Sequence, residues 1–335
     1  MPSLSDRRCT LHTRSRRTSL RPALCSVAIS TLCAVVWSRV GGGLSVSFAG
    51  AARHASRRPV AGGFATASSS GGALEGIEVD TIIFDIDDTL YPASCGFSNH
   101  RMSDVTKRFM VERLGFQSEA EAMALWSEYI QRYHSSLKGF KVATEEGRLP
   151  IPFRQEELGT YWADNCDFGK YIKKDTELVD MMRSLQQEAK MKLVAFTNAP
   201  RAYAIRSLEY LGIREYFADD HVFAVEDVLP ACKPERAAFE QVMRAVGAVP
   251  ERTVMFEDSM KNIRACRELG IHTVLIHEDK GDATGEAKLL GDAALPNDPS
   301  VDATLARAAD SRTALPGLWR GRFAVGKRAL ETSKL

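Results

Sequence analysis

The chain has 335 residues with 44 basic and 43 acidic side chains. This near balance hides a difference in charge between the first 74 residues and the rest. Residues 1–74 hold ten Arg, no Lys and one acid, so residues 75–335 hold 34 basic and 42 acidic residues, a net charge of −8. This acidic body argues against a nucleic-acid polymer as partner, because phosphate backbones attract basic surfaces. The seven Cys form no CxxC pair, which argues against a zinc site or a disulfide framework.

The first 74 residues have the composition of a targeting leader. They are rich in Arg and Ser and nearly free of acids, as organelle transit peptides are. Pro22–Trp37 is an apolar run that is short for a membrane span but suits a signal-peptide core. We expect a cleaved leader that directs the protein to an organelle, with a plastid first and a mitochondrion as the alternative. Two other interpretations are a retained membrane anchor and a cytoplasmic protein with a non-functional leader. After removal of the leader we expect no stable membrane partner.

Beyond the leader, short apolar runs that end in polar residues predict buried strands of a parallel sheet. Three clear runs and two weaker ones follow this pattern: Val79–Asp85, Met191–Thr197, Arg252–Asp258, Thr273–Ile276 and Val222–Val225. Segments with helical periodicity lie between them, each followed by Gly: Arg201–Leu211, Pro234–Val246 and Met260–Leu269. Strands that alternate with helices predict an α/β fold with a doubly wound parallel sheet, in which the strand ends converge on one crevice.

Residues 97–174 differ from the rest, because they show helical periodicity and no convincing strand. The helical stretches are Val105–Leu114, Glu119–Tyr133 and Glu156–Asn165. We interpret this segment as a helical cap inserted over the crevice; the alternative is that its helices belong to the layers of the sheet. The predicted organisation is therefore a disordered leader (1–74), a core (75–96 and 175–319), a cap (97–174) and a disordered tail (320–335).

Polar residues cluster at or beside the predicted strand ends. Asp85 and Asp87 lie two residues apart, and they share a side if the strand continues. Two carboxylates at one strand end repel each other unless a divalent cation neutralises them, and oxygen ligands suit Mg²⁺. One carboxylate can then act as a nucleophile and the other as a general acid and base.

Three further clusters supply the remaining chemistry. Thr197 and Asn198 can donate hydrogen bonds to phosphoryl oxygens, and Lys233 can neutralise their charge. Glu257 and Asp258 can complete a metal site. Each cluster alone has a common structural explanation, such as a turn or a helix cap. All four together, in this order, predict phosphoryl chemistry.

Four motifs resemble those of the haloacid dehalogenase-like hydrolase superfamily: FDIDDTLY (Phe84–Tyr91), FTN (Phe196–Asn198), CKP (Cys232–Pro234) and FEDS (Phe256–Ser259). The resemblance implies a Rossmann-like core with a helical cap inserted after the first motif. It implies that Asp85 is the nucleophile and Asp87 the acid and base, and that Thr197 and Lys233 bind the phosphoryl group.

The same resemblance implies Mg²⁺ as the cofactor. Its ligands would be Asp85, the backbone carbonyl of Asp87 and Asp258, with Glu257 as a possible outer ligand. The dehalogenases of the superfamily lack the second Asp of the first motif, so Asp87 favours phosphate chemistry.

Longer stretches are similar to the pyrimidine 5′-nucleotidase branch: Asp87–Phe97, Thr197–Ile213, Cys232–Met243, Phe256–Gly270 and Val301–Trp319. The resulting hypothesis is a Mg²⁺-dependent phosphatase that forms an aspartyl-phosphate and acts on a small-molecule phosphomonoester, a pyrimidine nucleoside 5′-monophosphate first. The alternatives are another small ester, such as a phosphosugar or a phosphoglycolate-like acid, and a non-catalytic phosphate-binding module. Several aromatic side chains could line the leaving-group pocket, with core packing as the alternative for each: Tyr91, Phe97, Tyr129, Tyr133, His134 and Trp162.

Overall fold

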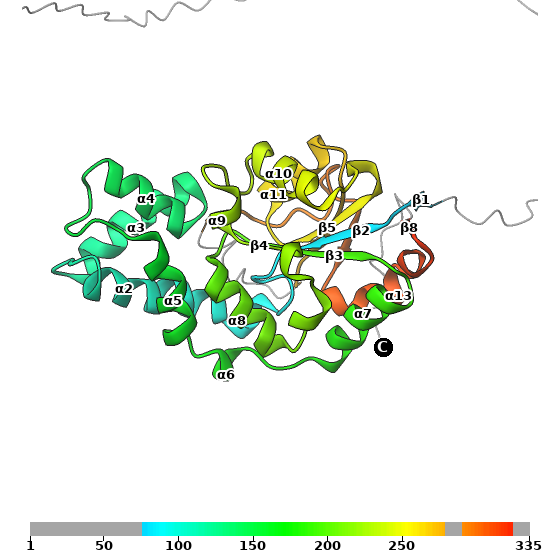
Figure 1. Ribbon diagram of the computed structural model, residues 1–335, viewed down its shortest axis with the longest axis horizontal. Helices are drawn as coiled ribbons and strands as arrows, with labels where there is room; N and C mark the ends of the chain where they lie inside the picture. The colour runs from blue at the N-terminus through cyan, green and yellow to red at the C-terminus, as the bar shows by residue number, and fades with distance from the viewer. Residues whose placement is uncertain (1–75, 279–289, 324–335) are drawn as a thin grey trace, which may run out of the picture. The chain divides into compact units, whose positions relative to one another are not determined.

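A parallel sheet of six strands forms the centre of the computed structural model, which describes residues 76–278 and 290–323 (Figure 1). The predicted leader, residues 1–74, lies outside the described residues. In sheet order the strands are β4 (Val222–Phe223), β3 (Lys192–Phe196), β2 (Thr81–Phe84), β5 (Thr253–Glu257), β6 (His272–Ile276) and β7 (Ala303–Leu305). Every neighbouring pair is parallel, so all six carboxyl ends lie along one edge.

Helices cover both faces of this sheet, which confirms the predicted α/β class. On one side lie α10 (Arg236–Val246) and α11 (Met260–Glu268), and on the other lie α7 (Thr176–Gln187), α8 (Arg201–Leu211) and α13 (Ser311–Ala314) (Figure 1). Each face of the sheet has its own hydrophobic core. The side chains of a strand alternate between these two cores, because successive strand residues point to opposite faces. Ile83 packs with Phe239 of α10, whereas Ile82 and Phe84 pack in the core that includes Leu208 of α8.

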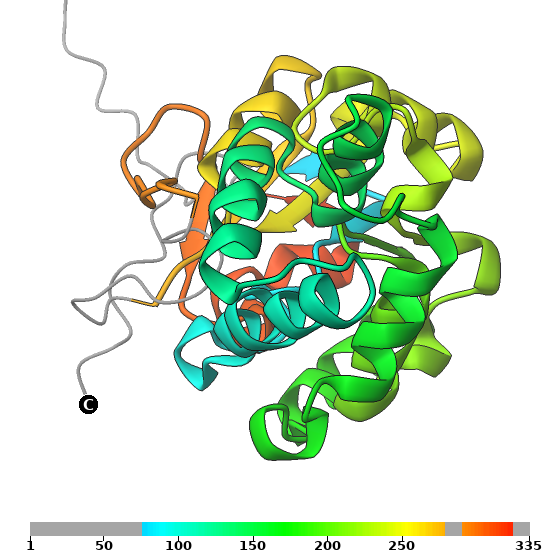
Figure 2. The ribbon, with the colours of Figure 1, turned by 90° about the vertical axis from the view of Figure 1, so that its left-hand side faces the viewer.

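The chain between β2 and β3 is helical, as predicted, and residues 97–174 contain no strand. Its helices are α1 (Phe97–Asn99), a π-helical turn η2 (His100–Val105), α2 (Thr106–Glu112), α3 (Glu119–Tyr133), α4 (Ser136–Glu145), α5 (Gln155–Asn165) and α6 (Phe168–Tyr171). Figures 1 and 2 show α2 to α5 gathered beyond one end of the sheet. Gly159 lets α5 approach α8 closely, since a Cβ there would lie 3.0 Å from Cβ of Pro200. The division into a core and a cap remains a prediction.

Two short strands at the opposite end correct the prediction for the tail. β1 (Ile77–Glu78) pairs antiparallel with β8 (Arg322–Phe323), which follows the 3-10 helix η7 (Pro316–Arg320). The expectation of disorder from residue 320 is therefore wrong for Arg320–Phe323. Phe323 is buried against the ring of His272, at 5.6 Å between ring centroids, and a two-residue strand leaves no periodicity that could predict it.

The single-turn helix α9 (Val225–Val228) follows β4. In the described ranges, no helix is both long and apolar enough to cross a bilayer.

Candidate active site

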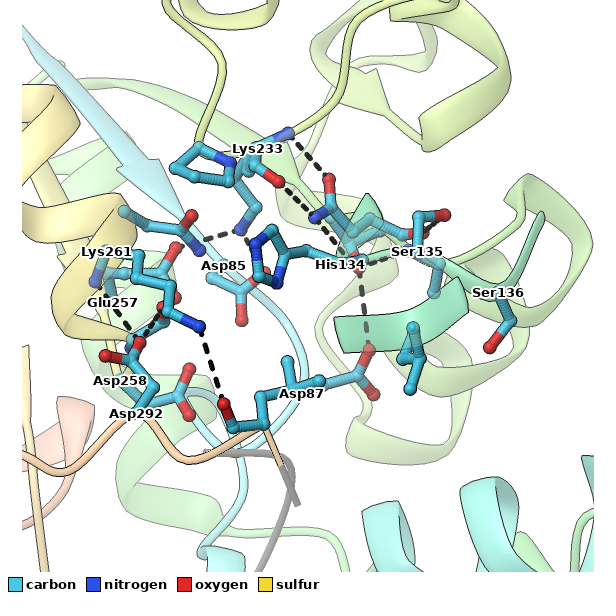
Figure 3. A pocket seen from close by; sticks show the side chains of 18 of the residues that line it. Asp85, Asp87, His134, Ser135, Ser136, Lys233, Glu257, Asp258, Lys261 and Asp292 are labelled. Carbon is cyan, nitrogen blue, oxygen red and sulfur yellow. Dashed lines mark hydrogen bonds and ion pairs between the residues drawn. The ribbon is translucent and has the colours of Figure 1, made fainter. Parts of the chain in front are cut away.

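The ends of three neighbouring strands bring the predicted residues to one pocket. Asp85 follows β2, Thr197 follows β3, and Asp258 follows β5, and β2 lies between the other two strands. Phe84 is in register with Ala195 and Phe256, so the three strands end at the same level. All seven predicted site residues line this pocket: Asp85, Asp87, Thr197, Asn198, Lys233, Glu257 and Asp258. Figure 3 labels all of them except Thr197 and Asn198.

Lys233 bridges two acids at the bottom of the pocket. Its Nζ lies 2.5 Å from Oδ1 of Asp85 and 2.9 Å from Oε2 of Glu257. All three residues are at least nine-tenths buried. Burial opposes the charge of Lys233, but Asp85 and Glu257 outweigh it and raise the pKa of the ammonium. The lysine is therefore a fixed positive charge inside the protein.

The acids outnumber this one cation. Burial raises the pKa of Asp85 well above its usual range although Lys233 acts in the opposite direction. Burial also raises the pKa of Asp258, and the charges of Glu257 and Asp88 add to the effect. Such shifts show that the negative charge of the cluster is only partly neutralised by the protein itself.

A divalent cation fits this cluster. Asp85, Glu257 and Asp258 each offer a carboxylate oxygen, and the three oxygens lie within 4.8 Å of one another. Carboxylate oxygens are the donors that Mg²⁺ prefers. Glu257, predicted as an outer ligand, lies in the same group as the two predicted direct ligands, and the carboxylate of Asp87 lies outside it.

The carboxylate of Asp87 is instead held mainly by two tyrosine hydroxyls and a guanidinium. The hydroxyls of Tyr91 and Tyr203 donate to its Oδ1 at 2.6 and 2.7 Å, and Nη1 of Arg101 lies 3.2 Å from its Oδ2. Burial raises the pKa of both tyrosines, so both hydroxyls keep their protons. Arg101 itself is buried between the rings of Trp162 and Tyr203, at 4.9 and 4.8 Å. These contacts fix the orientation of Asp87.

Thr197 and Asn198 follow the same strand but have different partners. Oγ1 of Thr197 lies 3.5 Å from Oδ2 of Asp87 and faces the pocket. The amide of Asn198 donates to the carbonyls of Lys233 and His134 and accepts from the backbone N–H of Lys233. Both hydrogens of the side-chain amide are thus used on backbone carbonyls, so this amide holds the backbone of Lys233 in place. That Asn198 binds phosphoryl oxygens stays a prediction.

Residues that support the site were not predicted from the sequence. Arg101 lines the pocket and Tyr203 contacts Asp87, but nothing in the sequence distinguishes either from a side chain used for packing. Asp292 accepts hydrogen bonds from Oγ of Ser259, at 2.5 Å, and from the backbone of Lys261, and thereby orders the start of α11. It follows β6 by 16 residues, and no motif in the sequence marks it.

A doubly wound sheet with acids and one lysine at its strand ends defines an α/β protein whose site suits phosphoryl or acyl chemistry. The sequence profile of the haloacid dehalogenase-like hydrolase family matches residues 79–270. The chain belongs to this family, as its four motifs predicted.

Two similar proteins match part of the chain in sequence. Phosphate metabolism protein 8 of Saccharomyces cerevisiae is 28% identical over 207 residues, which cover 58% of this chain and 61% of the relative. The chain therefore spans about three fifths of that protein. Glyceraldehyde 3-phosphate phosphatase of Methanopyrus kandleri is 27% identical over 208 residues, 60% of this chain and 85% of the relative.

Among solved structures, the L-2-haloacid dehalogenase of Xanthobacter autotrophicus is 12% identical with a TM-score of 0.45, covering 71% of this chain and 99% of that one. This likeness is too distant to bear on function.

Proposed function

We propose that the protein is a Mg²⁺-dependent phosphatase that hydrolyses small phosphomonoesters through an aspartyl-phosphate on Asp85. The observation that carries the proposal is the buried cluster in which Lys233 Nζ contacts both Asp85 and Glu257, beside Asp258. In-line phosphoryl transfer requires a placed nucleophile and fixed positive charge around the phosphoryl oxygens, and this cluster supplies both. The phosphatase among the relatives supports the same reaction type.

In the first step, a carboxylate oxygen of Asp85 forms a bond to phosphorus while the bond from phosphorus to the leaving oxygen breaks. Asp87 gives the leaving oxygen a proton. Lys233 and the hydroxyl of Thr197 balance the charge on the phosphoryl oxygens. A divalent cation bound by Asp85, Glu257 and Asp258 would neutralise these carboxylates and withdraw charge from the phosphoryl group.

In the second step, Asp87 takes a proton from water, and the water oxygen forms a bond to phosphorus as the bond to Asp85 breaks. Inorganic phosphate leaves and Asp85 is regenerated. The two tyrosine hydroxyls and Arg101 keep Asp87 in one orientation for both proton transfers.

The leaving group is proposed from resemblance. The name of the M. kandleri relative favours a phosphosugar-sized ester. The motif resemblance favours pyrimidine nucleoside 5′-monophosphates, which are therefore the second candidate.

Phosphate release by the full-length protein tests the proposal. Glyceraldehyde 3-phosphate, a hexose phosphate, phosphoglycolate, UMP and CMP would each be supplied with Mg²⁺ and again after chelation. We expect hydrolysis of at least one ester that is lost on chelation and restored by Mg²⁺. Highest turnover of UMP or CMP would select the nucleotidase. Binding of these esters without any phosphate release would contradict a phosphatase and select the non-catalytic module.

A further inference from the structure

His134 ends α3 in a backbone conformation that a side chain disfavours. Its φ is +54° and its ψ +17°, the left-handed region that residues with a Cβ rarely adopt. Helices commonly end in this conformation with Gly. His adopts this conformation more readily than most residues with a Cβ, so the contacts of its ring decide whether the side chain has a use.

Three hydrogen bonds fasten the turn around His134 to the strand-end side of the site. Sγ of Cys232 donates to the carbonyl of Tyr133 at 3.1 Å, and Nδ2 of Asn198 donates to the carbonyl of His134 at 3.0 Å. Oγ of Ser135 donates to the carbonyl of Asn198 at 2.9 Å. The turn is therefore held by its backbone and by Ser135, and the imidazole of His134 takes no part in holding it.

This imidazole projects into the pocket that contains Asp85 and Lys233 (Figure 3). Its Nδ1 is buried and has no hydrogen-bond partner among the described residues. A buried ring nitrogen without a partner is unfavourable unless a ligand or an ordered water molecule provides one. Burial, and after it the charge of Lys261, lower the pKa of His134, so the ring is neutral, with one nitrogen as donor and the other as acceptor.

We propose that His134 determines specificity by hydrogen bonding to a hydroxyl of the leaving group, a role that rests on the phosphatase activity proposed above. A hydroxyl both donates and accepts, and so does a neutral imidazole. The structure thus assigns the substrate to phosphate esters of hydroxylated alcohols, such as sugars, over aryl esters.

The variant His134→Gly separates this role from a structural one. Gly suits the left-handed conformation, so the variant should fold at least as stably as the natural chain. We compare the hydroxylated ester that the natural protein hydrolyses best with p-nitrophenyl phosphate, whose leaving group has no hydroxyl beyond the reacting oxygen. Loss of one neutral hydrogen bond should lower kcat/KM for the hydroxylated ester about three- to tenfold and leave that for the aryl ester unchanged.

Three further variants complete the test. His134→Ala keeps the unfavourable backbone but lacks the imidazole, so it should lose selectivity as His134→Gly does. His134→Asn tolerates the conformation and keeps a donor and an acceptor, so it should recover part of the selectivity. Lys190→Gly is the matched control, because Lys190 is exposed, has a φ of +58° and does not line the pocket; its selectivity should be that of the natural chain.

If the natural protein is active, an equal loss of kcat/KM for both esters in His134→Gly would overturn the role of His134. No loss of kcat/KM for either ester would overturn it too. A natural protein that hydrolyses neither ester in Mg²⁺ would instead overturn the proposed phosphatase, and the role of His134 with it.

Discussion

The two walls of the pocket are built differently. The strand-end wall consists of charges that neutralise one another at short range, with Lys233 within 2.9 Å of both Asp85 and Glu257. The helical wall contributes rings, among them His134 and Trp162, and one buried guanidinium. We infer that the strand ends carry the bond-breaking chemistry and that the helices choose the leaving group, and the predictions below test this division.

The largest effect is expected from the nucleophile. Asp85→Asn keeps the shape of the side chain but removes the negative charge that attacks phosphorus. Phosphate release should fall by a factor on the order of 10³ or more for every ester, whatever its leaving group. Steady-state kinetics measures this, with circular dichroism as the check that the variant is folded. Activity close to that of the natural chain would contradict the assignment.

Lys233→Met should abolish activity and destabilise the fold. The substitution leaves Asp85, Glu257 and Asp258 buried together without their cation, and breaking a buried ion pair costs about 3–5 kcal/mol. Urea unfolding of the metal-free protein measures this loss, and added Mg²⁺ should reverse part of it. Arg148→Met is the control, because Arg148 pairs with Glu128 on the surface, and its loss should leave the unfolding midpoint nearly unchanged. Similar unfolding midpoints for the two variants would contradict a stabilising role of the buried ion pairs of Lys233.

Tyr203→Phe should have a moderate effect, because it removes one donor to Asp87 and keeps the ring against Arg101. Loss of one hydrogen bond to a charged group should lower kcat about 10- to 100-fold. Tyr210→Phe on the same helix is the matched control, since Tyr210 is exposed and does not line the pocket. An equal loss in both variants would show that the effect arises from helix packing and not from Asp87.

The smallest expected effect is a pH-dependent stabilisation by Mg²⁺. In the folded metal-free protein the pKa values of Asp85 and Asp258 lie above the ordinary value of 3.8. As pH rises above 3.8, the folded state keeps protons that the unfolded state has lost, so these two groups make folding less favourable. Mg²⁺ binds the deprotonated carboxylates, so the rise in Tm that it causes should grow as the pH rises through the raised pKa values of the two groups. Asp258→Asn should flatten this dependence, and a Mg²⁺ effect that is independent of pH would argue against these ligands.

The sequence predicted the strand-end wall well, for a physical reason. Buried strands appear as apolar runs, and polar residues such as Asp85, Thr197 and Asp258 follow directly where the runs end. Because parallel strands share one edge, order along the chain was sufficient to bring these residues together.

The helical wall depends on contacts that no local pattern records. Arg101 meets Asp87 and Tyr203 only after folding, and the conformation of His134 is a property of the backbone. α4 was missed because Gly139 weakens its helical pattern. In the structure this Gly allows close packing on α3, since a Cβ there would lie 3.1 Å from Cβ of Tyr129. A polar residue at a strand end can serve substrate or backbone, and only the structure shows that the side chain of Asn198 binds the backbone of Lys233.

Capture of the phosphorylated protein is the most direct test of the division between the two walls. The full-length protein would be mixed with its best ester and Mg²⁺, quenched in acid within one turnover, digested and analysed by mass spectrometry. We predict that the added phosphoryl group is on Asp85 for sugar, nucleoside and aryl esters alike. Turnover with the phosphoryl group on another residue, or with none on the protein at any quench time, would contradict Asp85 as the nucleophile.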